Sequence, residues 1–187
     1  MDAAIFIDKD GTLIYDIPYN VDPDLIVIRN NSIDGLKMLC ERGFKLIVIS
    51  NQSGVACGYF CEEDLYIVEE KLRSLLEPLS IKLSGFYFCP HYANGIIHEY
   101  AVDCFCRKPM PGMLLHAAEV NNIDLSSSWM IGDILNDVEA GNRAGCRSIL
   151  ICNGGETEWK SGQFRTPEKT CQNINEAAEY ILTHQFS

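Results

Sequence analysis

The stretch AIFIDKDGTL, residues 4–13, joins a short apolar run to two acids that are separated by one residue and followed by a Gly-Thr pair. An apolar run without polar alternation is typical of a strand that is buried on both faces. Asp8 and Asp10 come directly after that strand. Because ligands of parallel α/β sheets bind beyond the carboxyl ends of the strands, the stretch predicts a functional site at that edge.

Four more segments share the short, apolar character of the first predicted strand, residues 3–7. They are 45–49, 85–89, 129–131 and 147–152. Segments with apolar residues at helical spacing alternate with them, and we predict helices at 33–42, 62–77, 111–121, 136–144 and 175–183. Gly43 and Gly145 are predicted to end two of these helices. The alternation predicts an α/β fold, a Rossmann-like parallel sheet in three layers, with residues 1–187 forming a single domain.

The composition narrows the classes of function. Hydrophobic residues make up 47% of the 187, which suits one domain with a sizeable core. A formal net charge of −11 makes nucleic acid and anionic membranes poor partners. The sequence contains no apolar run long enough to span a membrane, and its first residues lack the features of a signal peptide. We therefore expect a cytoplasmic protein that acts on a small molecule.

Nine cysteines are present, and without a secretory signal disulfides are the weakest interpretation. Cys40, Cys146 and Cys152 lie in apolar segments and are predicted to be reduced core residues. Cys57 and Cys61 have no evident partner pair, so packing or plain surface is favoured over a metal site for these two. The remaining clustered cysteines need a separate explanation.

Polar side chains follow three of the predicted strands. Asp8 and Asp10 follow the first, Ser50 the second and Asp133 the fourth. Crowded carboxylates repel one another unless a cation lies among them, and oxygen ligands of this kind suit Mg²⁺ together with phosphate oxygens. One carboxylate can attack phosphorus while a second transfers protons, and the Lys108 ammonium can stabilise the phosphoryl charge. The pattern predicts magnesium-dependent phosphoryl chemistry.

Structural alternatives exist for these acids. Asp8 and Asp10 can be explained as hydrogen-bonding residues of a strand-end turn. Asp133 can be explained as the N-cap of the helix predicted to start near Asn136. Asp137 has two equal interpretations: it orients Lys108 or the metal-bound waters, or it only favours the helix dipole.

A second metal site is predicted in the long segment between residues 90 and 109, which interrupts the alternation of strands and helices. The pair Cys89-x-His91 is followed after twelve residues by Cys104-x-Cys106. Three thiolates and an imidazole form a closed, structural zinc site, which would staple an otherwise structureless loop. His98 competes as a ligand, and a reactive loop of unlinked cysteines is the alternative. Zinc at Cys106 would also aim the adjacent Arg107 and Lys108.

The motifs together carry a family resemblance. DKDGTL at 8–13, Ser50, Lys108 and GDILND at 132–137 resemble the four motifs of the haloacid dehalogenase superfamily. The resemblance implies a Mg²⁺-dependent phosphatase in which Asp8 is the nucleophile and Asp10 the general acid and base. It implies that Asp8, Asp133 and the main-chain carbonyl of Asp10 bind the metal. Ser50 and Lys108 would hold the phosphoryl group.

Within that superfamily, CPH at 89–91, CFCRKPMPGM at 104–113 and SNQSGVA at 50–56 resemble the heptose-bisphosphate and histidinol-phosphate phosphatase families. These families lack a large cap domain, and the gap between Leu13 and Ile33 holds only a small flap. The resemblance implies the substrate-binding residues Asp16, Ile17, Pro18, Tyr19, Asn51, Gln52, Ser53 and Arg107.

One residue departs from the heptose pattern, because Ile134 follows Gly132-Asp133 where a basic residue is expected. Heptose 1,7-bisphosphate is the first expected substrate and histidinol phosphate the second. The expected cofactors are catalytic Mg²⁺ and structural Zn²⁺, and a monomer is expected. From a different class, a zinc-organised binding module that has lost catalysis is the remaining alternative.

Overall fold

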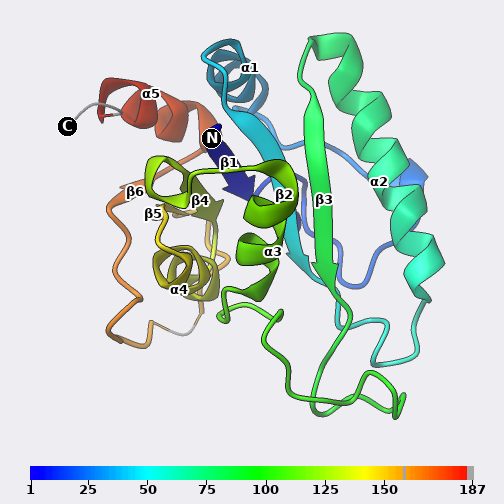
Figure 1. Cartoon of the computed structure of the whole chain (residues 1–187). Coiled ribbons are helices and arrows are strands. Elements are labelled where there is room, and N and C mark those ends of the chain that lie inside the picture. Colours follow the sequence, from blue (N-terminus) through cyan, green and yellow to red (C-terminus); the bar gives the residue numbers. More distant parts are fainter. Residues whose placement is uncertain (158, 185–187) are drawn as a thin grey trace.

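The computed structural model describes residues 1–157 and 159–184. Along the chain, strands and helices alternate over most of its length (Figure 1). The elements are β1 (Ala4–Ile7), α1 (Ile33–Glu41), β2 (Lys45–Asn51), α2 (Glu62–Leu76), β3 (Leu83–Cys89), α3 (Gly112–Asn121), β4 (Trp129–Gly132), α4 (Leu135–Ala144), β5 (Arg147–Ile151), β6 (Lys169–Cys171) and α5 (Ile174–His184). Single turns of 3-10 helix occur at Pro23–Leu25, Glu77–Leu79 and Leu125–Ser127.

The described strands form one parallel sheet in the order β3-β2-β1-β4-β5-β6. All four side chains of β1 are buried, because alternate residues point into two different cores. Ile5 and Ile7 join the core beneath α1, α2 and α5. Ala4 and Phe6 join the core beneath α3 and α4. The predicted three-layer α/β fold is therefore confirmed.

Two glycines end helices as the sequence predicts. Gly43 follows α1 with φ +90°, and Gly145 follows α4 with φ +92°. This left-handed conformation is one that residues with a Cβ rarely adopt. Each glycine reverses the chain into a strand, so α1 leads into β2 and α4 into β5. The short connections keep those strands parallel and adjacent to β1 and β4.

Some details differ from the sequence prediction. β6 was not predicted, because only Cys171 of its three residues is buried and so no apolar run marks it. Cys146 is buried as predicted and Cys40 is half-buried, but Cys152 is exposed because it lies just past the end of β5. Between β1 and α1 the chain has one 3-10 turn and isolated bridges, so no large cap domain is inserted there. No helix in the described ranges has the length and apolar character needed to cross a bilayer.

Candidate active site

The turn after β1 carries the two acids of the opening motif. Asp8 is 8% exposed, and its backbone N–H donates to Ile131 O at 2.9 Å, which joins the turn to β4. Gly11 has φ +82°, and a Cβ there would lie 2.3 Å from Asp133 Oδ2. The glycine is needed twice over, for its conformation and for the close approach of that carboxylate. The DKDG turn is thereby packed directly against the end of β4.

Lys108 connects three parts of the site. Its buried ammonium donates to Asp8 Oδ1 and to Ile49 O, the latter at 2.9 Å, and lies 2.7 Å from Asp137 Oδ1. Two of these contacts are hydrogen bonds, and the contact with Asp137 is an ion pair. Burial lowers the pKa of Lys108, but the carboxylates of Asp137 and Asp8 outweigh that effect and raise it. Lys108 is therefore a permanent cation at the centre of the site.

Two residues at the carboxyl end of β2 organise the side of the site opposite β4. Gln52 Nε2 donates to Ser50 Oγ at 2.7 Å and to Asp10 Oδ2 at 3.0 Å. Asn51 and the backbone of Lys108 exchange two hydrogen bonds, at 3.0 and 3.1 Å. The end of β2 thus fixes both the second acid and the segment that carries the central lysine.

Asp133 and Asp137 lie at the start of α4. Thr12 Oγ1 donates to Asp133 Oδ1 at 3.2 Å. Burial, and then the charge of Asp137, raise the pKa of Asp133 to about 6. Asp137 accepts the Ile134 N–H at 3.2 Å while its other oxygen pairs with Lys108. Asp137 therefore interacts with the start of the helix and also orients the lysine, so its two interpretations from the sequence coexist. Asp133 is not the N-cap of α4, because that position is occupied by Ile134.

The carboxylates match the donor set of a hard divalent cation. Asp8, Asp133 and Asp137 each offer an oxygen, and these atoms lie within 4.8 Å of one another. Burial raises the pKa of Asp8 well above its ordinary value, with Asp137 and Asp133 acting in the same direction and Lys108 opposing them. Three buried carboxylates around one ammonium carry excess negative charge, which a bound Mg²⁺ would balance. Asp10 lies outside this group, because Lys9 and Gln52 hold its carboxylate oxygens.

The second predicted cluster also assembles. Cys89, His91, Cys104 and Cys106 offer four ligand atoms within 4.8 Å of one another. Cys106 Sγ lies 2.9 Å from Cys89 Sγ and 3.3 Å from His91 Nδ1. Contact with these neighbours lowers the pKa of Cys106 to about 5, against the opposing effect of burial. This Cys₃His set fits the tetrahedral preference of zinc, and His98 is not part of it.

The cysteine cluster is joined to the predicted phosphate-binding residues. Arg107 N–H donates to Cys104 Sγ at 3.3 Å, and its guanidinium donates to His91 O at 3.1 Å and lies over the Tyr92 ring. These contacts hold the main chain immediately before Lys108. In Figure 1 the loop that contains the cluster lies beyond the carboxyl end of β3 and leads into α3.

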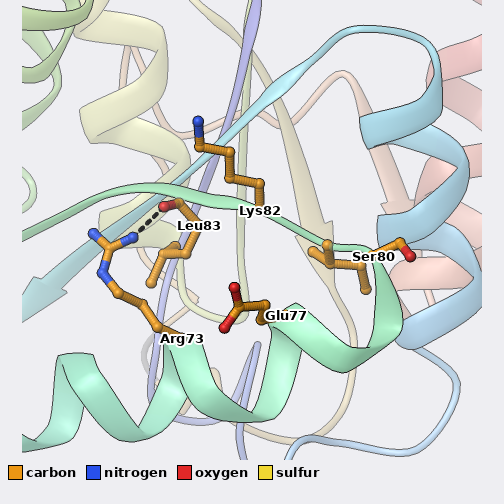
Figure 2. Close-up of a pocket in the computed structure, with 6 residues that line it drawn as sticks. Arg73, Glu77, Ser80, Lys82 and Leu83 are labelled. Atoms are coloured by element: carbon orange, nitrogen blue, oxygen red, sulfur yellow. Dashed lines mark hydrogen bonds between the residues drawn. The ribbon is translucent and has the colours of Figure 1, made fainter.

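A pocket of about 290 Å³ adjoins Asp10. Most of the predicted substrate-binding residues line it, but Ile17 and Arg107 do not. The lining residues are Asp10, Asp16, Pro18, Tyr19, Asn20, Asn51, Gln52, Ser53 and Gly54. A different cavity of about 440 Å³, drawn in Figure 2, lies at the amino-terminal end of β3, where Arg73 donates to Leu83 O. That cavity is at the opposite edge of the sheet from the acids.

Sequence reasoning missed two residues that support the site. Lys9 is 1% exposed and lies 2.7 Å from Asp10 Oδ1. Asn153 Nδ2 donates to Gly11 O at 2.6 Å. Asn153 follows β5, so the rule that polar residues gather at strand ends would have found it. No such rule predicts that Lys9 points back toward its neighbour.

The other residues considered from the sequence lie outside the site. Trp159 is 64% exposed in the segment between β5 and β6. Cys61 Sγ lies 3.2 Å from Asp64 Oδ2 at the start of α2. In the described part of the chain, neither Cys57 nor Cys61 joins a group with metal-binding geometry.

Known proteins resemble this chain in both sequence and fold. A family model described as HAD-hydrolase-like matches residues 105–177. The D-glycero-beta-D-manno-heptose-1,7-bisphosphate 7-phosphatase of Yersinia pestis is 38% identical over 160 residues, which cover 86% of this chain and 85% of that protein.

Solved structures agree with these matches. A HAD-like phosphatase from Mesorhizobium loti has a TM-score of 0.84 and 30% identity, covering 97% of this chain and 86% of its own. A D,D-heptose 1,7-bisphosphate phosphatase from B. bronchiseptica, complexed with magnesium and phosphate, has a TM-score of 0.78 and 27% identity. The match covers 97% of this chain and 98% of that chain.

The fold and the cluster of carboxylates around a lysine define a hydrolase of the haloacid dehalogenase type. The chain belongs to the HAD-like phosphatases, a family of phosphoric monoester hydrolases.

Proposed function

We propose that this protein hydrolyses a phosphorylated sugar, D-glycero-D-manno-heptose 1,7-bisphosphate, in a Mg²⁺-dependent reaction through an aspartyl phosphate on Asp8. The observation that carries the proposal is the convergence of Asp8, Asp10, Lys108 and Asp133 at one sheet edge. The names of the relatives from Yersinia pestis and B. bronchiseptica support the choice of sugar.

Asp8, Asp133 and the main-chain carbonyl of Asp10 would hold the magnesium ion, with Asp137 beside them. When bound, Mg²⁺ supplies positive charge for the phosphoryl oxygens and balances the crowded carboxylates. Lys108 and the Ser50 hydroxyl hold the phosphoryl group from the opposite side. Lys108 also favours the ionised form of Asp8, against the burial that raises the pKa of this carboxyl.

The reaction follows from the placement of the two acids. An oxygen of the Asp8 carboxylate attacks phosphorus, a new P–O bond forms, and the P–O bond to the sugar breaks. The Asp10 carboxyl donates its proton to the leaving sugar oxygen. Asp10 then takes a proton from a water molecule whose oxygen attacks phosphorus, and inorganic phosphate leaves as Asp8 is restored. Gln52 and Lys9 hold Asp10 in position for both transfers.

The zinc site acts indirectly in this proposal. Cys89, His91, Cys104 and Cys106 would bind a structural Zn²⁺. The metal would anchor Arg107, which recognises substrate, and would hold the main chain of Lys108 in register with Asn51. Its role is to position the cations rather than to take part in bond breaking.

Histidinol phosphate is the second candidate substrate, and the pocket provides a specific reason to retain it. Asp10 and Asp16 are among the residues that line the 290 Å³ pocket. Two carboxylates there would attract the ammonium and imidazolium groups of histidinol phosphate. Heptose bisphosphate ranks first because the relatives that carry its name match most of the chain.

The test is phosphate release in the presence of Mg²⁺ from the two substrates side by side, with Asp8→Asn as the blank. We expect a large preference for heptose 1,7-bisphosphate that disappears in the variant. A preference for histidinol phosphate would contradict the proposed heptose substrate and support the second candidate with the same mechanism. Equal release by wild type and Asp8→Asn would overturn the nucleophile assignment.

A further inference from the structure

Two exposed tyrosines meet beside the substrate pocket. Tyr19, in the flap between β1 and α1, is 53% exposed, and Tyr59, between β2 and α2, is 62% exposed. Their ring centroids are 4.6 Å apart with the planes at 70°, an edge-to-face contact. Tyr19 lines the pocket, so the contact places Tyr59 next to it. Large aromatic rings left open to solvent in a group often mark a binding surface.

The backbone holds Tyr19 in an uncommon conformation. Its φ is +57°, in the left-handed region that non-glycine residues seldom adopt. The following residue keeps the turn closed, because Asn20 N–H donates to Ile17 O at 3.1 Å and Asn20 Oδ1 accepts the Asp22 N–H at 3.0 Å. The Tyr19 ring is thus presented by a fixed turn.

Tyr59 is held from two sides. Its N–H donates to Gly54 O at 2.9 Å, which closes the loop on itself. The segment between His91 and Cys104 then supports it from outside, because Ala56 O accepts the N–H groups of both Ile96 and Ile97, at 2.8 and 2.9 Å. The loop that carries Tyr59 is therefore braced by the segment between the two halves of the Cys₃His cluster.

The residues around the pocket offer two kinds of chemistry. The carboxylate and amide groups of Asp16, Asn20 and Gln52 can accept and donate hydrogen bonds. Tyr19 adds an aromatic ring to the lining, and the Tyr59 ring lies against it. Among the described residues that line the pocket, none is Lys or Arg, so the part of a substrate that enters there is uncharged or cationic rather than a second phosphate. Hydroxyl groups opposite an apolar C–H face are the combination that a sugar offers.

We propose that Tyr59 is a specificity-determining residue, which forms with Tyr19 an aromatic wall that packs against the C–H face of the sugar. The inference rests on the proposed sugar-phosphate activity and names how the non-reacting part of the substrate is recognised. The reacting phosphate lies at Asp8, and any further phosphate lies outside the space between the tyrosines and the amides. Truncation of Tyr59 removes one of the two rings of this wall and leaves the acids in place.

The test compares Tyr59→Ala, Tyr59→Phe and the matched surface control Tyr66→Ala, since Tyr66 lies on α2 and is 54% exposed. The readout is kcat/KM for heptose 1,7-bisphosphate divided by kcat/KM for ethyl phosphate, which has no sugar. We expect Tyr59→Ala to lower this ratio by about three- to tenfold, the range of one aromatic contact, mainly through KM. Tyr59→Phe and Tyr66→Ala should keep the wild-type ratio.

An unchanged ratio in Tyr59→Ala would overturn the inference. To separate the inference from the choice of heptose, the ratio is also measured with hexose and pentose phosphates. If wild type prefers another sugar ester, the proposed heptose substrate fails, and the ratio for that ester decides on Tyr59 in the same way. If wild type hydrolyses no sugar ester better than ethyl phosphate, both proposals are overturned.

Discussion

Replacing Asp133 by Asn should stabilise the Mg²⁺-free protein while abolishing its activity. Burial and the neighbouring Asp137 raise the pKa of Asp133 from an ordinary 3.8 to about 6. The folded protein therefore resists ionising this carboxyl. A pKa difference of one corresponds to about 1.4 kcal/mol, so the ionised group costs the fold about 3 kcal/mol at neutral pH. Asn keeps the shape and can still accept the hydrogen bond from Thr12.

The sign of the pH dependence follows from the same values. An acid with a raised pKa in the folded state costs stability fully above pH 6 and not at all below about pH 3.8. The difference in free energy of unfolding between Asp133→Asn and wild type should therefore shrink as the pH falls through this window. For a domain of this size, about 3 kcal/mol corresponds to a rise in melting temperature of roughly 6–12 °C.

The assay is urea denaturation of wild type and Asp133→Asn at neutral pH, with zinc retained and Mg²⁺ either omitted or added. Glu119→Gln on α3 is the control, because it removes one negative charge from an exposed position. We expect added Mg²⁺ to stabilise wild type and leave Asp133→Asn unchanged. The reasoning is refuted if Asp133→Asn is no more stable than the control without Mg²⁺, or if Mg²⁺ stabilises both proteins equally.

Three further predictions test other parts of the structure. Cys104→Ser should lose about one zinc per chain on metal analysis, as expected for a four-ligand site, and retention of zinc would contradict the Cys₃His assignment. Lys108→Met should abolish phosphate release. Without Mg²⁺ it should also lower the free energy of unfolding by about 3–5 kcal/mol, because two buried carboxylates lose their partner. The control variant Lys45→Met breaks a surface ion pair and should lower the free energy of unfolding by at most about 1 kcal/mol. Hydrogen bonds from Arg147 lower the pKa of Glu168, so Glu168→Gln should lower the free energy of unfolding by about 0.5 kcal/mol at pH 7. This difference between the two proteins should vanish in acid, below the folded pKa of Glu168. A difference that grows in acid would contradict the prediction.

The sequence by itself determined the α/β class and most of the elements. Strands such as β1 and β5 are buried on both faces, so their apolar runs are visible without knowledge of their neighbours. β6 was not predicted, because two of its three residues are exposed and its place in the sheet depends on pairing with β5. Strand pairing over such a short, polar segment leaves no local signal.

The sequence also determined where the chemistry gathers. Asp8 and Asp133 follow strands and Ser50 lies near the end of β2, and parallel strands bring their carboxyl ends to one edge whatever the details of packing. The spacing of Cys89, His91 and the later cysteine pair likewise predicted a cluster with metal-binding geometry, because the residues of each pair lie within one turn of chain.

Only the tertiary structure decided how these groups are paired. Lys108 follows a long loop, and its contacts with Asp8 and Asp137 join positions far apart in the chain. Tyr59 meets Tyr19 because a fixed turn and a loop braced by the segment between His91 and Cys104 bring the two rings together. Periodicity records which side chains face the core, but contacts between loops depend on the packing of many residues at once, so no single stretch of sequence specifies them.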